Sequence, residues 1–274
     1  MSTTLAVEPL ALPSFKEFQT LQRAWYISAV GYAALTVFCF AAGFVDDRLF
    51  NGVSVWHKPF KFALSISVYF ATLVWFAKYL RPGALTTWHG KLLVAIPTFM
   101  ALFEMVYIIL MAALGQASHY NFSTPFYATM YSLMGFGATC MVLVLPWLGF
   151  LVVRNVGFWH PLGLAIFLGL TLTLLLGGGF GGYLGGAGSH WVNAAPTDAN
   201  GIWLFKWVTD GGDLRVAHFF GMHAMQALPL FALLLPNAWS AAWRNTLIVA
   251  FAAAYSAFTT VTFVQAINGQ PFIG

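Results

Sequence analysis

Seven long hydrophobic stretches follow one another along the chain, separated by shorter polar segments. A bilayer core about 30 Å thick is crossed by a helix of about 20 apolar residues, and each stretch reaches that length. We expect membrane-spanning helices over residues 24–45, 60–80, 92–114, 125–152, 160–184, 215–236 and 244–267. The pattern therefore predicts an all-α integral membrane protein, a bundle of seven transmembrane helices.

Two of these stretches contain residues that disturb a regular helix. The fourth contains Gly135, Gly137 and Pro146, so the pattern does not define the residues at which this helix begins and ends. The fifth ends in a glycine-rich run over residues 177–182, where we expect the helix to unwind before its nominal end.

The segments between the stretches indicate one domain. Residues 1–23 form a short, mildly polar N-terminal segment without the features of a cleaved signal peptide, and residues 24–274 form a single seven-helix domain. The one long connection, residues 185–214, is rich in Trp, Asn, Asp and Gly. We expect it to cap the helix ends on its side of the membrane.

Composition supports insertion in a bilayer. Hydrophobic residues make up 60% of the 274 residues and charged residues 7%, whereas soluble domains have about 25% charged residues. So few charges could not cover the surface of a soluble domain of this size. The net charge of +4 comes from basic residues near helix ends, which indicates topology signals and lipid headgroup contacts and excludes a nucleic-acid surface.

The distribution of lysine and arginine predicts the orientation. With the N-terminus inside, seven of these residues lie in inner segments: Lys16, Arg23, Lys78, Arg81, Lys91, Arg154 and Arg244. Five lie in outer segments: Arg48, Lys58, Lys61, Lys206 and Arg215. The excess inside predicts a cytoplasmic N-terminus and a periplasmic C-terminus in a bacterial inner membrane.

Five of the seven histidines are expected at a single membrane face, next to the ends of hydrophobic helices: His57, His119, His190, His218 and His223. An even number of spans separates the segments that carry them, so they share a face whichever way the protein is inserted. A titratable cluster at a membrane boundary is costly unless it is paired, hydrated or bound to a ligand. The alternative for each histidine alone is a structural role.

Two carboxylates are candidate catalytic residues. Glu104 shares a helix face with Tyr107 and lies about ten residues, or roughly 15 Å, below the outer end of its helix. At that depth a carboxylate needs a partner or a proton, so we expect a proton relay or a ligand contact, with Lys61 as one possible partner. Asp213 is an expected N-cap of the sixth helix and a second candidate base.

The start of the sixth helix is the segment densest in candidate ligands. His218 and His223 are five residues apart, which turns their side chains about 140° from each other. They therefore cannot hold one metal ion as an i, i+4 pair would. Arg215 lies next to the face of His218, and Gln226 shares the face of His223.

Three classes of function fit these residues. The first is a redox protein that holds haem b or a transition metal (Cu, Zn or Fe) on two or more of His119, His190, His218 and His223. Lys58, Lys61 and Arg215 would pair with haem propionates. The sequence has no CxxCH motif, which excludes covalently attached c-type haem.

The second class is a membrane enzyme acting on a lipophilic substrate. It would use either a metal-bound water with Glu104 or Asp213 as base, or Ser118 or Ser189 activated by His218. The third class is a transporter or membrane subunit that binds a small anion or amphiphile. A quinone-like molecule is a further candidate partner.

Overall fold

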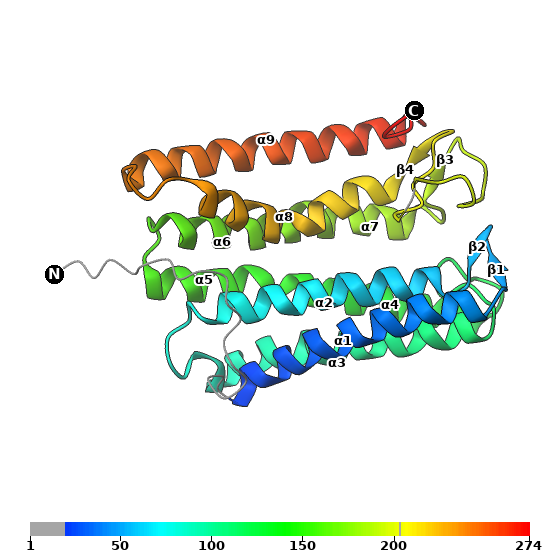
Figure 1. The fold of residues 1–274 in the computed structure, drawn as a ribbon, viewed down its shortest axis with the longest axis horizontal. Coiled ribbons are helices and arrows are strands. Elements are labelled where there is room, and N and C mark those ends of the chain that lie inside the picture. The colour runs from blue at the N-terminus through cyan, green and yellow to red at the C-terminus, as the bar shows by residue number, and fades with distance from the viewer. Residues whose placement is uncertain (1–19, 203) are drawn as a thin grey trace.

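The computed structural model describes residues 20–202 and 204–274 and shows a bundle of long helices (Figure 1). Seven helical spans are long and apolar enough to cross a membrane: Gln22–Val45, His57–Ala77, Trp88–Ala113, Pro125–Val156, Pro161–Gly186, Leu214–Leu234 and Ala241–Ile267. The predicted number of spans is confirmed. Most of the predicted N-terminal segment lies outside the described residues, and the first helix begins at Thr20.

Five spans are single helices, and two are composite. The single helices are α1 (Thr20–Val45), α2 (His57–Ala77), α3 (Trp88–Ala113), α8 (Leu214–Leu234) and α9 (Ala241–Ile267). The fourth span consists of α4 (Pro125–Leu143) and α5 (Leu145–Val156). The fifth consists of α6 (Pro161–Leu172), a π-helical segment (Thr173–Gly178) and α7 (Gly179–Gly186).

The composite spans differ in part from the sequence expectation. The fourth is interrupted at Val144, two residues before Pro146, whereas Gly135 and Gly137 lie within regular helix. The fifth does not unwind at its glycines, and it remains helical to Gly186 after widening into the π-helix. Backbone groups inside a bilayer need intrahelical partners, so widening a turn is less costly than opening it.

Alternate connections meet at the same end of the bundle (Figure 1). One end has the hairpin of β1 (Leu49–Phe50) and β2 (Val53–Ser54), the pair β3 (Trp191–Val192) and β4 (Gly212–Asp213), the α3–α4 connection and the C-terminus. We call this the histidine-bearing end. The opposite end has the α2–α3, α5–α6 and α8–α9 connections, with the short 3₁₀ helix Ala84–Thr86.

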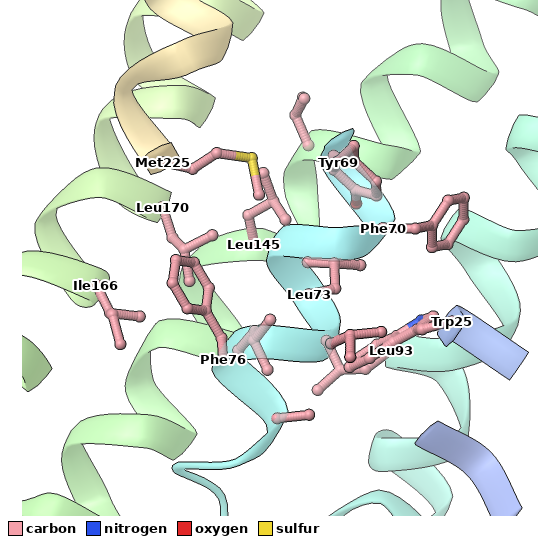
Figure 2. Packing of buried hydrophobic residues seen from close by; sticks show 14 of the residues in the cluster. Trp25, Tyr69, Phe70, Leu73, Phe76, Leu93, Leu145, Ile166, Leu170 and Met225 are labelled. Atoms are coloured by element: carbon pink, nitrogen blue, oxygen red, sulfur yellow. The ribbon is translucent and has the colours of Figure 1, made fainter. Parts of the chain in front are cut away.

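Buried apolar side chains from both halves of the chain form the core (Figure 2). Phe70, Leu73 and Phe76 of α2 lie at its centre and are at most 1% exposed. They belong to one cluster with Trp25 of α1 and Met225 of α8. In a bilayer this packing stabilises mainly through close van der Waals contact, because lipid chains are as apolar as the core.

The outer helices leave large apolar side chains uncovered. On α1, Phe38, Phe40 and Phe44 are 57%, 56% and 78% exposed, and Val261 of α9 is 63% exposed. So much apolar surface would drive association in water, but it is the ordinary surface of a helix facing lipid.

Candidate functional site

Four of the five histidines of the predicted cluster lie at the histidine-bearing end, and His223 lies deeper, near the middle of α8. His57 is the first residue of α2, His119 lies between α3 and α4, and His190 lies between α7 and α8. His218 and His223 lie in the first half of α8. The other two histidines, His89 and His160, begin α3 and cap α6 at the opposite end.

A network of charged side chains joins the α7–α8 connection to the start of α8. The Arg215 guanidinium donates to Asp213 at 2.6 Å and to Asp198 at 2.9 Å. It also donates to the carbonyl of Lys206 at 2.6 Å. His190 Nε2 lies 3.4 Å from the same Asp198 carboxylate. The predicted propionate partner Arg215 and the predicted base Asp213 thus already have protein partners.

The same network sets the protonation of the loop residues. Burial alone would raise the pKa of Asp198, but its contacts with His190 and Arg215 outweigh burial and hold that pKa well below its usual value. For His190, burial lowers the pKa, with the charge of Arg215 adding to the effect. His190 is therefore neutral and Asp198 ionised near pH 7.

Asp213 also forms the expected N-cap of α8. Its carboxylate accepts the backbone N–H of Arg215 at 3.0 Å and that of Val208 at 3.1 Å, and its side chain is fully buried. The cap prediction is confirmed. These contacts fill the carboxylate oxygens, and its role as a base stays a prediction.

His119 lies against α2 and α4. Its ring packs on Phe62 and Tyr131, with centroids 5.4 Å and 5.8 Å away, and Nδ1 is 3.2 Å from the Ser118 hydroxyl. Burial lowers the pKa of His119 well below its ordinary value, and the nearby charge of Lys58 adds to this effect. His119 is therefore a neutral imidazole.

The two histidines of α8 face different neighbours. His218 Nδ1 donates to the carbonyl of Gly177 in the π-helical segment at 2.9 Å. His223 Nδ1 lies 3.2 Å from Oε1 of Gln226, whose amide donates to Thr72 of α2 at 2.9 Å. The structure thus gives the two rings separate environments, as their spacing predicts.

In both cases an oxygen acceptor beside Nδ1 fixes the tautomer. A neutral imidazole that gives its Nδ1 proton to an oxygen keeps an unprotonated Nε2. Among the described residues, no side chain or backbone group bonds to Nε2 of His218 or His223. Each Nε2 can accept a proton or a hydrogen bond, or bind a metal.

The two lysines at the start of α2 have different partners. Lys61 Nζ donates to the carbonyl of Phe205 at 3.0 Å, which ties α2 to the long connection. Lys58 Nζ lies 5.8 Å from the centre of the Phe62 ring, without a carboxylate at ion-pair distance among the described residues. Of these two lysines, Lys58 is therefore the one whose ammonium group can donate hydrogen bonds to a ligand.

Glu104 is deeply buried on α3, 5% exposed, and its Oε1 has no partner. It faces α4, since a methyl group on Gly137 would lie 3.6 Å from that oxygen. One turn nearer the histidine-bearing end, the buried hydroxyl of Tyr107 also lacks a partner. Lys61, the partner considered from the sequence, donates instead to the carbonyl of Phe205.

Some predicted combinations are not brought together. Among the residues that the structure describes, no three His, Cys, Asp or Glu side chains are arranged to hold a metal ion. Ser118 contacts His119, and the Ser189 hydroxyl contacts Trp191, so neither serine contacts His218. The two cysteines, Cys39 and Cys140, are free thiols.

Sequence reasoning missed several contacts of this site. Asp198 joins His190 to Arg215, and Phe62 lies between Lys58 and His119. The position of Phe62, one turn after Lys58, could have indicated the second contact. No local pattern marks Asp198, because its partners depend on how the long connection folds.

Comparison with protein-family models gives no match, and neither do the searches of curated proteins and of solved structures. The fold and the site define the class: a helical protein with seven candidate membrane spans and a polar cluster at one end.

Proposed function

We propose that this chain is an integral membrane protein that binds the polar head of a lipophilic, quinone-like molecule at the histidine-bearing end. One observation carries the proposal: among the described residues, four buried polar side-chain atoms in the half of the bundle nearer this end have no hydrogen-bond partner. They are His57 Nε2, Glu104 Oε1, the Tyr107 hydroxyl and Trp191 Nε1. Buried polar groups are nearly always satisfied, so such atoms indicate a missing partner.

The available groups match a quinone head in both of its redox forms. A quinone presents carbonyl oxygens that accept hydrogen bonds, and the quinol presents hydroxyl groups that donate them. Lys58 supplies a donor, while Glu104 and the Nε2 atoms of His218 and His223 supply acceptors. Phe62 and Tyr107 offer aromatic surface for the ring.

Binding of a short-chain benzoquinone to the purified protein in detergent tests this proposal. We expect saturable binding that weakens about tenfold in Glu104→Gln and in Lys58→Gln, because a hydrogen bond to a charged group contributes about 1.5–3 kcal/mol. Arg48→Gln is the matched control, since Arg48 is a cation at the same end that pairs with Asp46. Absence of saturable binding, or equal affinity in all variants, would refute the proposal.

A redox protein with haem b or a transition metal is the second candidate. It is favoured by the free Nε2 atoms of His218 and His223, because metal-bound histidines commonly give Nδ1–H to an oxygen in this way. Any haem would take two axial ligands from His119, His190, His218 and His223. An optical spectrum and metal analysis of the purified protein decide: no Soret band and no bound metal would exclude it.

The hydrolase and transporter hypotheses stay predictions. Loss of hydrolase activity with chelators or in Ser189→Ala would favour the hydrolase, and flux in proteoliposomes would favour the transporter. For the topology, we propose a cytoplasmic N-terminus and a periplasmic C-terminus in a bacterial inner membrane, which exposes the site to the periplasm.

A further inference from the structure

A second polar feature lies at the opposite end of the bundle, away from the histidines. A cavity of about 240 Å³ opens there between the α2–α3 connection and the end of α5, and its lining includes Arg81, Gly83, Thr87, His89, Leu151 and Arg154. Drug-sized ligands usually occupy about 300–1,000 Å³, so this volume suits a small polar group.

The two arginines give the cavity a positive charge that no carboxylate among the described lining residues offsets. Arg81 donates to the backbone carbonyl of Arg154 at 2.9 Å, which holds the two residues next to each other. The Arg154 guanidinium lies 5.8 Å from the centre of the Phe150 ring. Every aspartate and glutamate that the structure describes lies nearer the histidine-bearing end, as do all its ion pairs.

Aromatic side chains place this cavity at the level of lipid headgroups. The His89 ring lies edge-on to Trp88 and Trp147, with centroids 5.3 Å and 5.6 Å away. Trp88 is 75% exposed, and Trp159 at the same end is 70% exposed. Exposed tryptophans of this kind mark the membrane–water interface.

From this placement we infer that the Arg81–Arg154 cavity is a binding site for a phosphate group, supplied by the head of an anionic phospholipid. Paired guanidinium groups match phosphate oxygens in geometry and charge. Basic pockets between membrane helices at the cytoplasmic surface bind such headgroups. The site is independent of the proposed quinone-like ligand.

Native mass spectrometry of the detergent-purified protein, with phosphatidylglycerol and phosphatidylcholine in competition, tests the inference. We expect the wild type to retain phosphatidylglycerol about tenfold more strongly. Arg154→Gln should reduce this retention about fivefold, the equivalent of about 1 kcal/mol per basic residue near the lipid surface. This variant leaves intact the hydrogen bond from Arg81, which goes to the Arg154 backbone.

Lys91→Gln is the matched control, because Lys91 is exposed at the same end and does not line the cavity. It should change retention less than twofold. The double variant Arg81→Gln/Arg154→Gln should abolish the lipid preference, with a melting temperature to confirm that it folds.

Titration with inorganic phosphate distinguishes the two sources of the anion. If millimolar phosphate leaves phosphatidylglycerol bound, the lipid is the ligand, as inferred. If inorganic phosphate binds and displaces the lipid, the arginines form a phosphate site, but the inference that a phospholipid supplies the phosphate is wrong. Equal retention of both lipids by the wild type, or unchanged retention in both arginine variants, would overturn the inference.

Discussion

Asp213 shows how much one side chain contributes at the residue scale. It caps α8, accepts the backbone N–H of Val208 and pairs with Arg215, all from a position without solvent exposure. Sequence alone identified the cap, because an aspartate directly before a periodic apolar segment is a local signal. The contact with Val208 required the folded connection.

Replacement of this carboxylate should destabilise the protein strongly. We expect Asp213→Ala to lower the free energy of unfolding by about 3–5 kcal/mol, since it leaves a partly buried arginine without its closest partner. Asp46→Ala, which removes the partner of the exposed Arg48, should lower it much less. Thermal unfolding in detergent measures both, and equal losses would contradict the distinction between the two pairs.

Acid should loosen the α7–α8 connection. The pKa values of His119 and His190 are lowered by burial, so the folded state binds fewer protons than the unfolded state below about pH 6.5. Their contribution to stability is therefore present above that pH and is lost as the pH falls through this range. Asp198, whose pKa is also lowered, adds a further loss below about pH 4.

Amide hydrogen exchange over residues 187–213 measures this effect. After correction for the intrinsic rate, exchange should be faster at pH 5.5 than at pH 7.5, and His190→Gln should reduce the difference. The α8–α9 connection at the opposite end, which contains no titratable side chain, serves as an internal reference. Equal corrected exchange at the two pH values would argue against buried neutral histidines.

At the element scale, the fifth span is where sequence and structure differ most. Its glycines predict unwinding, whereas the structure keeps the helix and uses small residues for close approach to α8. A methyl group on Gly221 of α8 would lie 2.7 Å from the Cα of Gly177 in the π-helical segment. The same segment supplies the carbonyl that fixes the tautomer of His218.

Gly221→Ala should therefore push α8 away from the π-helical segment. We expect a loss of about 1–3 kcal/mol in the free energy of unfolding, the usual cost of overpacking a tight contact. Gly135→Ala is the control, because nothing lies within 4 Å of that position and alanine favours helix. If the two variants unfold at the same temperature, the proposed close contact is wrong.

At the scale of the whole molecule, we expect the candidate spans to place the two ends of the bundle on opposite sides of the membrane. Ser123 is exposed at the histidine-bearing end and Thr86 at the opposite end. In a variant without Cys39 and Cys140, we expect an impermeant maleimide to label Ser123→Cys in intact bacterial cells. Thr86→Cys should be labelled only after lysis.

The excess of basic residues at the opposite end is the reason for this expected orientation. Labelling of Thr86→Cys alone would reverse the orientation and place the histidines in the cytoplasm. Labelling of both positions in intact cells would contradict a membrane-spanning α3, the one candidate span between them.

Hydrophobic length is a local property, so the sequence by itself determined the seven spans and the meeting of the histidine segments at one end. The partners of the polar atoms were decided only by the tertiary structure. Gln226 bonds to Thr72, 154 residues away, and His218 bonds to Gly177, 41 residues away. Such pairings depend on how helices pack and rotate against each other, which the apolar pattern of each helix leaves open.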